Sequence, residues 1–171
     1  MQNILFLCSD NRTRSIFAES IMRKAGAGRF RAFSAGAFPA KAVHPLALDI
    51  LQSFDYPTDG LAPKDWFQFN NPDSDLRMDF VLTVCDQTPP DRCPTFAGQP
   101  PSARWPVADP ELHHDGEADL ADAFVRTFYD IKGRIELFLA LPLDRMTRFQ
   151  IEDHMTGIAS APLPEAPSRH G

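Results

Sequence analysis

Residues 4–15 of the chain read ILFLCSDNRTRS. Residues 4–7 are apolar and predict a short buried strand, which ends abruptly in the polar residues 8–13. After this loop, apolar residues at positions 17, 21 and 25 lie on one helical stripe, and glycines at 26 and 28 are a plausible stop. The stretch therefore predicts a strand, a loop and a helix in direct succession.

Strand and helix patterns continue to alternate along the chain. Further strands are expected at 30–35, 79–84 and 103–107, and helices at 44–54, 64–69, 117–141 and 143–158. Between them, residues 86–101 hold five prolines, which predicts an irregular excursion. Alternation of this kind predicts an α/β fold with a parallel sheet covered on both faces, whose ligands bind at the carboxyl ends of the strands.

Length and composition narrow the class of protein. A chain of 171 residues suits one compact domain, and no stretch is apolar enough to span a membrane or to resemble a signal peptide. The net charge of −6 argues against a nucleic-acid partner. We therefore expect a cytoplasmic protein, in which three cysteines are an unlikely basis for a structural disulfide framework.

The loop after the first strand has the makings of an anion cradle. Five residues separate Cys8 from Arg14, so inward-pointing amides, a helix amino terminus and a guanidinium could converge on one oxyanion. Thiols in such places have pKa values of about 3.5–7.5, so we expect Cys8 to be a thiolate at neutral pH, aimed at phosphorus or arsenic. From spacing alone, a cysteine at the end of an apolar strand is more often a small core residue than a nucleophile.

The segment CSDNRTRS, residues 8–15, resembles the phosphate-binding loop shared by low-molecular-weight tyrosine phosphatases and thioredoxin-coupled arsenate reductases. The resemblance covers roughly residues 3–141. Further segments match in order: Ala18-Glu19, Ser34-Ala35-Gly36, His44-Pro45-Leu46-Ala47, Val84-Cys85-Asp86, Cys93-Pro94, Trp105-Pro106 and Asp109-Pro110.

This resemblance implies a flavodoxin-like three-layer sandwich around four parallel strands. We expect a catalytic domain at 1–142, a helical extension at 143–160 and a disordered tail at 161–171. The resemblance also implies which loop residues bind the oxyanion: Ser9, Asp10, Asn11, Arg12, Thr13, Arg14 and Ser15. Within the loop, we expect Asn11 to brace the backbone and Ser15 to donate a hydrogen bond to Cys8.

Asp10 departs from the family, whose loop normally has glycine at this position. Aspartate tolerates a left-handed backbone better than most residues but adds a negative charge beside a bound anion. We expect either that Asp10 points outward or that Arg12 compensates it, and otherwise that anion affinity is weakened.

The resemblance assigns Asp109 as the acid that protonates a leaving oxygen, although Asp-Pro alone is also a common turn. Cys85 and Cys93 match the relay cysteines of the reductases, which pass a disulfide outward to thioredoxin. We therefore expect an arsenate reductase with an external thiol reductant, no bound cofactor and no metal. The alternatives are a phosphatase acting on phosphate esters and a noncatalytic anion-binding or redox-binding protein.

Overall fold

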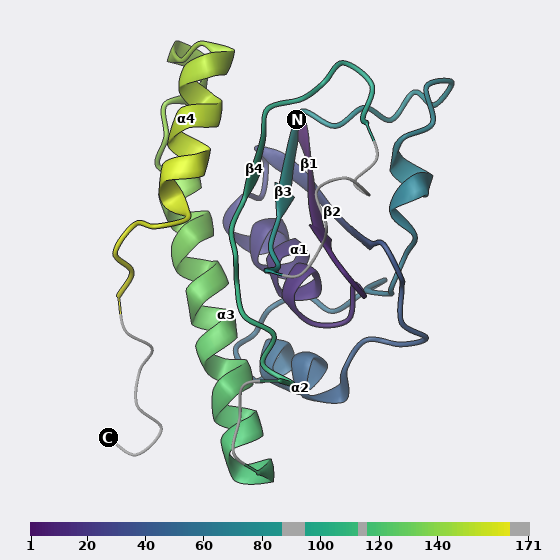
Figure 1. Ribbon diagram of the computed structural model, residues 1–171, viewed down its shortest axis with the longest axis vertical. Helices are drawn as coiled ribbons and strands as arrows, with labels where there is room; N and C mark the ends of the chain where they lie inside the picture. Colours follow the sequence, from purple (N-terminus) through teal and green to yellow (C-terminus); the bar gives the residue numbers. More distant parts are fainter. Residues whose placement is uncertain (87–94, 113–115, 165–171) are drawn as a thin grey trace.

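The computed structural model describes residues 1–86, 95–112 and 116–164, and its centre is a four-stranded parallel sheet (Figure 1). The strands lie in the order β2-β1-β3-β4, so β1 is flanked on both sides. Leu7 of β1 pairs with Ala35 of β2 and Thr83 of β3. The bounds are β1 Gln2–Cys8, β2 Phe30–Gly36, β3 Phe80–Thr83 and β4 Ser102–Arg104.

Helices and connecting segments form a layer on each face of this sheet. The α-helices are α1 Arg14–Ala25, α2 Pro45–Ser53, α3 Glu117–Leu139 and α4 Arg148–Ile158, and the 3-10 helices are η1 Trp66–Phe69 and η3 Leu143–Arg145. In Figure 1, α3 and α4 lie together on one side of the sheet and η1 lies on the other. None of the described helices is long and apolar enough to cross a lipid bilayer.

Two buried clusters divide the core because successive side chains of a strand point to opposite faces. Ile4 and Phe6 of β1 belong to the larger cluster, with side chains of all four α-helices. Leu5 and Leu7 belong to the smaller one, with Trp66 of η1. The predicted three-layer α/β architecture of the flavodoxin type is confirmed, and its second covering layer consists of η1 and irregular segments.

Most predicted elements are present, with differences at their ends. The last strand, expected over 103–107, spans Ser102–Arg104. The Trp105 amide still donates to the Thr83 carbonyl at 2.7 Å, but Pro106 has no amide to donate and the Val107 amide turns back to the Trp105 carbonyl. The Trp105 indole faces α4, where its Nε1 donates to the Met155 carbonyl at 2.9 Å. The helix expected over 64–69 is the single 3-10 turn η1. The helix expected over 143–158 is divided into η3 and α4, and Thr147 and Gln150 form a capping box at the start of α4.

The carboxyl ends of β1, β3 and β4 meet at one edge of the sheet. β1 ends at Cys8, β3 leads into residues 84–86, and β4 leads into residues 105–112. Residues 87–94 with Cys93, and residues 165–171 of the expected disordered tail, lie outside the described parts of the chain. This edge is where sequence reasoning placed the site.

Candidate functional site

The loop from Cys8 to Ser15 wraps around the Cys8 sulfur, which lies within 3.7 Å of polar atoms of Asp10, Asn11 and Ser15. The Asn11 amide donates to the Cys8 sulfur at 3.2 Å. Asn11 has φ 51°, in the left-handed region that asparagine adopts more readily than most residues. Four loop carbonyls point the other way and accept amides of the segment after β2: Cys8 from Ala37, Ser9 from Phe38, Asp10 from Ala40 and Arg12 from His44. The loop therefore has the backbone polarity of an anion nest.

The Asn11 side chain holds the Ser15 end of this loop against β2 and the Lys64 backbone. Its Nδ2 donates to Ser15 Oγ at 2.7 Å and to Ser34 Oγ at 2.9 Å, and its Oδ1 accepts the Lys64 amide at 2.8 Å. Since Ser15 Oγ already accepts from Asn11, its own proton is available to Cys8 Sγ, 3.0 Å away. The geometry thus fits the expected brace and the expected donor.

Behind this brace lies a buried network that sequence reasoning did not assign. Ser34 Oγ donates to Glu19 Oε1 at 2.9 Å, and Glu19 is 1% exposed. Its charge is balanced by Arg23, at 2.6 Å, and by Lys64, at 3.7 Å. Ser34 and Glu19 stand in segments that resemble the family, which was the one available signal for their role.

Gly36 lies directly against the loop. A Cβ atom at this position would be 2.9 Å from both the Asn11 amide nitrogen and the Ser9 carbonyl oxygen. Backbone atoms cannot move aside as a flexible side chain can, so any larger residue would displace the loop. The end of β2 therefore fixes the position of the cradle.

Cys8 is fully buried, and this changes its expected protonation state. Burial raises the pKa of the Cys8 thiol above its ordinary value, and Arg14 and Ser15 oppose this effect while Asp10 adds to it. This direction is opposite to the lowered pKa that the sequence predicts for Cys8. A low-dielectric surrounding outweighs the cation that sequence reasoning relied on.

Asp10 neither points outward nor pairs with the Arg12 side chain. Its Oδ1 accepts the Arg12 amide at 3.3 Å and lies 3.7 Å from Cys8 Sγ, in the geometry of a thiol-to-carboxylate hydrogen bond. The Arg12 guanidinium instead pairs with Glu111 at 3.1 Å. Both expected ways of removing the Asp10 charge from the cradle are therefore wrong.

Arg14, at the start of α1, is 2% exposed and reaches across to the other strand ends. Its NH1 donates to the Val107 carbonyl at 2.9 Å and to Asp86 Oδ1 at 3.2 Å, and its NH2 lies 3.7 Å from Asp109 Oδ2. The structure thus brings together Arg14 and the candidate acid Asp109. Asp86 holds the guanidinium as well, a role that sequence reasoning did not assign to it.

The two oxygens of the Asp109 carboxylate have different partners, one in a local turn and one in the site. Its Oδ1 accepts the Glu111 amide at 2.9 Å, which is the turn that an Asp-Pro pair favours, while Oδ2 faces Arg14. Glu111 in turn lies 3.5 Å from His44 Nε2. His44 Nδ1 accepts the Leu46 amide at the start of α2, and burial lowers the pKa of His44. Glu111 therefore links the loop that carries Asp109, residues 105–112 and called the acid loop below, to α2 and to Arg12. Sequence reasoning did not identify this role of Glu111.

Cys85 lies beside the cradle. The Val84 amide donates to the Leu7 carbonyl at 2.8 Å, so the ends of β1 and β3 stay paired up to the residues before Cys8 and Cys85. Both cysteines are buried and belong to the same cluster. The partner expected for Cys85, Cys93, is among the residues that are not described.

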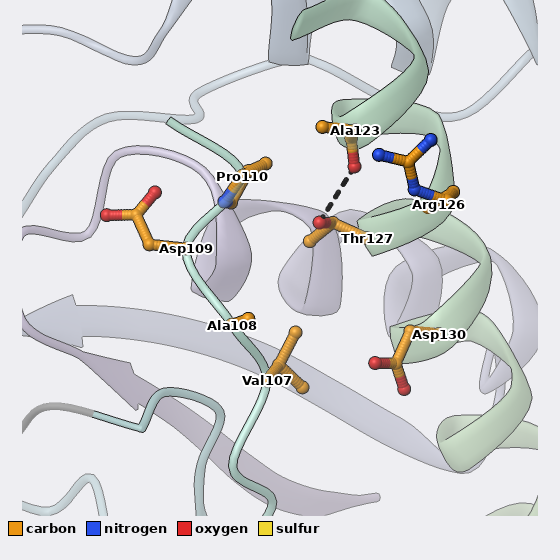
Figure 2. Close-up of a pocket in the computed structure, with 8 residues that line it drawn as sticks. All are labelled: Val107, Ala108, Asp109, Pro110, Ala123, Arg126, Thr127 and Asp130. Atoms are coloured by element: carbon orange, nitrogen blue, oxygen red, sulfur yellow. Dashed lines mark hydrogen bonds between the residues drawn. The ribbon is translucent and has the colours of Figure 1, made fainter. Parts of the chain in front are cut away.

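A cavity of about 180 Å³ lies between the acid loop and α3. In Figure 2, Arg126, Thr127 and Asp130 stand on the α3 side of it, while the Asp109 carboxylate points away from that helix. Residues 107–110 therefore separate this cavity from the cradle.

Comparison with known proteins gives one family match. The family model for low molecular weight phosphotyrosine protein phosphatase matches residues 3–145. A search of curated proteins found no significant match.

Several solved structures share this fold. An arsenate reductase in the phosphate binding state has a TM-score of 0.65 at 24% identity, over 82% of this chain and 98% of that chain. An arsenate reductase in the intermediate state has a TM-score of 0.60 at 26% identity, over 82% and 98%. The Corynebacterium glutamicum thioredoxin-dependent arsenate reductase has a TM-score of 0.57 at 23% identity, and the match covers 85% of this chain but only 64% of that one.

Proposed function

Because this chain belongs to the low molecular weight phosphotyrosine protein phosphatase family, we propose that its cradle binds arsenate and that its three cysteines reduce arsenate to arsenite. The observation that supports the reductase is the position of Cys85. It follows the end of β3, next to the end of β1 with Cys8, and a phosphatase reaction has no use for a second thiol there.

The reaction begins with a bond between sulfur and arsenic. Arg14 and the loop amides orient the anion, and Cys8 attacks arsenic as a thiolate while one arsenate oxygen leaves as water, protonated by Asp109. Arsenic is still As(V) in this adduct. Burial favours the protonated form of Cys8, so its proton passes to an oxygen of the bound arsenate before the attack, and Ser15 then donates to the thiolate that remains.

Thiol exchange then carries out the reduction. Cys85 attacks the Cys8 sulfur, a disulfide forms, and the electron pair of the broken sulfur–arsenic bond stays on arsenic, which leaves as arsenite, As(III). Cys93 next attacks Cys85 and releases Cys8. A reduced external dithiol, for which we propose thioredoxin, supplies the two electrons that reduce the Cys85–Cys93 disulfide.

Single-turnover experiments on three variants test this order. With arsenate and no reductant, Cys85→Ser should keep a Cys8–arsenic adduct and release no arsenite. Cys93→Ser should release one equivalent of arsenite and stop at a Cys8–Cys85 disulfide, and Cys8→Ser should do neither. Mass spectrometry identifies each species. Steady NADPH oxidation by Cys93→Ser in the presence of thioredoxin and thioredoxin reductase would contradict the relay.

A phosphatase is the second candidate, and the contact between Arg14 and Asp109 favours it. Together with Cys8, these residues suffice for a phosphocysteine mechanism. Hydrolysis of p-nitrophenyl phosphate that survives Cys85→Ser, without arsenate turnover, would support the phosphatase. If the folded, reduced protein shows neither arsenate reduction nor phosphate-ester hydrolysis, the noncatalytic alternative would be supported.

A further inference from the structure

Asp10 is the one loop carboxylate, and its Oδ1 lies inside the cradle. It accepts the Arg12 amide at 3.3 Å, a donor that the loop would otherwise offer to a bound anion, and it lies 3.7 Å from the Cys8 sulfur. Among the described residues, no cationic side chain forms an ion pair with it, since Arg12 and Arg14 pair with other carboxylates. An oxyanion attacked by Cys8 must therefore place an oxygen close to Asp10.

We propose that Asp10 makes the cradle select oxyanions that carry a proton. A carboxylate can only accept hydrogen bonds, so a hydroxyl on arsenic or phosphorus can donate to it, whereas an unprotonated oxygen meets a like charge with no donor between them. Asp10 is thus a specificity-determining residue that excludes fully ionised anions by an unpaired charge.

This inference rests on the proposed function and narrows its substrate class. Inorganic arsenate and phosphate both keep at least one hydroxyl at neutral pH. A phosphate monoester loses its last proton near pH 6 and is mostly an unprotonated dianion at pH 7. Asp10 therefore favours arsenate over phosphate esters in the same cradle, which a glycine at this position would not do.

Phosphate and sulfate make a matched pair of probes, because both are tetrahedral but sulfate carries no proton at neutral pH. Isothermal titration calorimetry at pH 7 and fixed ionic strength should show phosphate binding roughly 10- to 100-fold tighter than sulfate, the usual effect of a hydrogen bond to a charged group. Asp10→Gly and the isosteric Asp10→Asn should bring this ratio close to one, mainly by improving sulfate binding. Asp144→Asn changes the net charge equally and lies at the opposite end of the strands, beside Met1 and Gln2, so it should leave the ratio unchanged.

Equal affinities in the unaltered protein, or the same ratio in Asp10→Gly, would overturn the inference. Failure of the unaltered protein to bind either anion would overturn it as well, since Asp10 would then exclude anions of both kinds. Thermal unfolding of each variant shows that it is folded. Binding needs no turnover, so a failure of arsenate reduction with the ratio intact would reject the proposed function and leave the selectivity in place.

Discussion

At the residue scale, Ser15 is placed to stabilise the Cys8 thiolate, which can only accept a hydrogen bond from the Ser15 hydroxyl. Asn11 donates to Ser15 Oγ, so Ser15 donates to the sulfur 3.0 Å away. Ser15→Ala should slow alkylation of Cys8 by iodoacetamide at neutral pH roughly tenfold, since a hydrogen bond to a charged group contributes about 1.5–3 kcal/mol. Peptide mass spectrometry measures the rate at Cys8. Ser20→Ala is the matched control, because Ser20 is equally buried on α1 but donates to the Pro57 carbonyl, and an equal effect there would contradict the assignment.

The buried thiol also makes folding stability depend on pH. Burial raises the pKa of Cys8, so the folded protein keeps a proton that the unfolded chain loses above about pH 8.5. The stability that Cys8 contributes is therefore fully present below that pH and is lost as the pH rises through the folded-state value. Urea unfolding of the reduced protein should show its stability falling relative to Cys8→Ser between pH 7 and pH 10. A constant difference would show that the thiol is not desolvated.

Sequence reasoning was better at identifying the residues of the cradle than at predicting the pKa of Cys8 or the orientation of Asp10. The family resemblance, together with the hydrogen-bonding capacity of the two side chains, was enough to place Asn11 and Ser15 beside Cys8. The direction of the pKa shift depends on complete burial, which no local pattern reveals. The orientation of Asp10 depends on which partner Arg12 takes, and that partner, Glu111, lies 99 positions further along the chain.

At the scale of elements, the end of β2 supports the loop after β1. Gly36→Ala should displace the loop, because its Cβ would lie 2.9 Å from two backbone atoms. We expect a loss of about 1–3 kcal/mol in the free energy of unfolding and weaker phosphate binding. Gly157→Ala in α4 is the control, since nothing lies within 4 Å of its added Cβ, and helix propensity makes it neutral or stabilising. Thermal unfolding and calorimetry measure both effects, and intact phosphate binding in Gly36→Ala would show that the loop is not held by β2.

Elements with strong periodicity were predictable, and those that depend on distant partners were not. The β1–loop–α1 unit follows from apolar runs and polar loop residues, and α3 follows from its long apolar stripe. The end of β4 before Pro106 is a local feature, but the anchoring of Trp105 is not, because its indole finds its acceptor in α4, 50 positions away. Likewise, the turn that positions Asp109 is a local feature, but its link through Glu111 to His44 is not.

At the scale of the whole molecule, α4 belongs to the core although the family match ends at residue 145. Ile151, Met155 and Ile158 are buried in the same cluster as β1 and α1. Glu152 Oε1 also accepts the Ser102 amide, so α4 covers the outer strand of the sheet, an edge that would otherwise invite pairing with other chains. The expected boundary at residue 142 thus divides a continuous core, and whether the first part folds alone stays a prediction.

Met155→Ala tests how strongly α4 supports the remainder of the protein. Met155 is fully buried, so truncation should lower the free energy of unfolding by about 2–5 kcal/mol through lost transfer energy and the cavity left behind. The carbonyl that accepts from Trp105 is backbone and stays in place, so phosphate affinity at the distant cradle should not change. Urea unfolding should remain a single transition, because one cluster joins α4 to the sheet. Thr156→Ala, one position along and exposed, is the control and should have little effect. Two separate transitions in Met155→Ala, or an unchanged stability, would show that α4 is an appendage rather than part of the core.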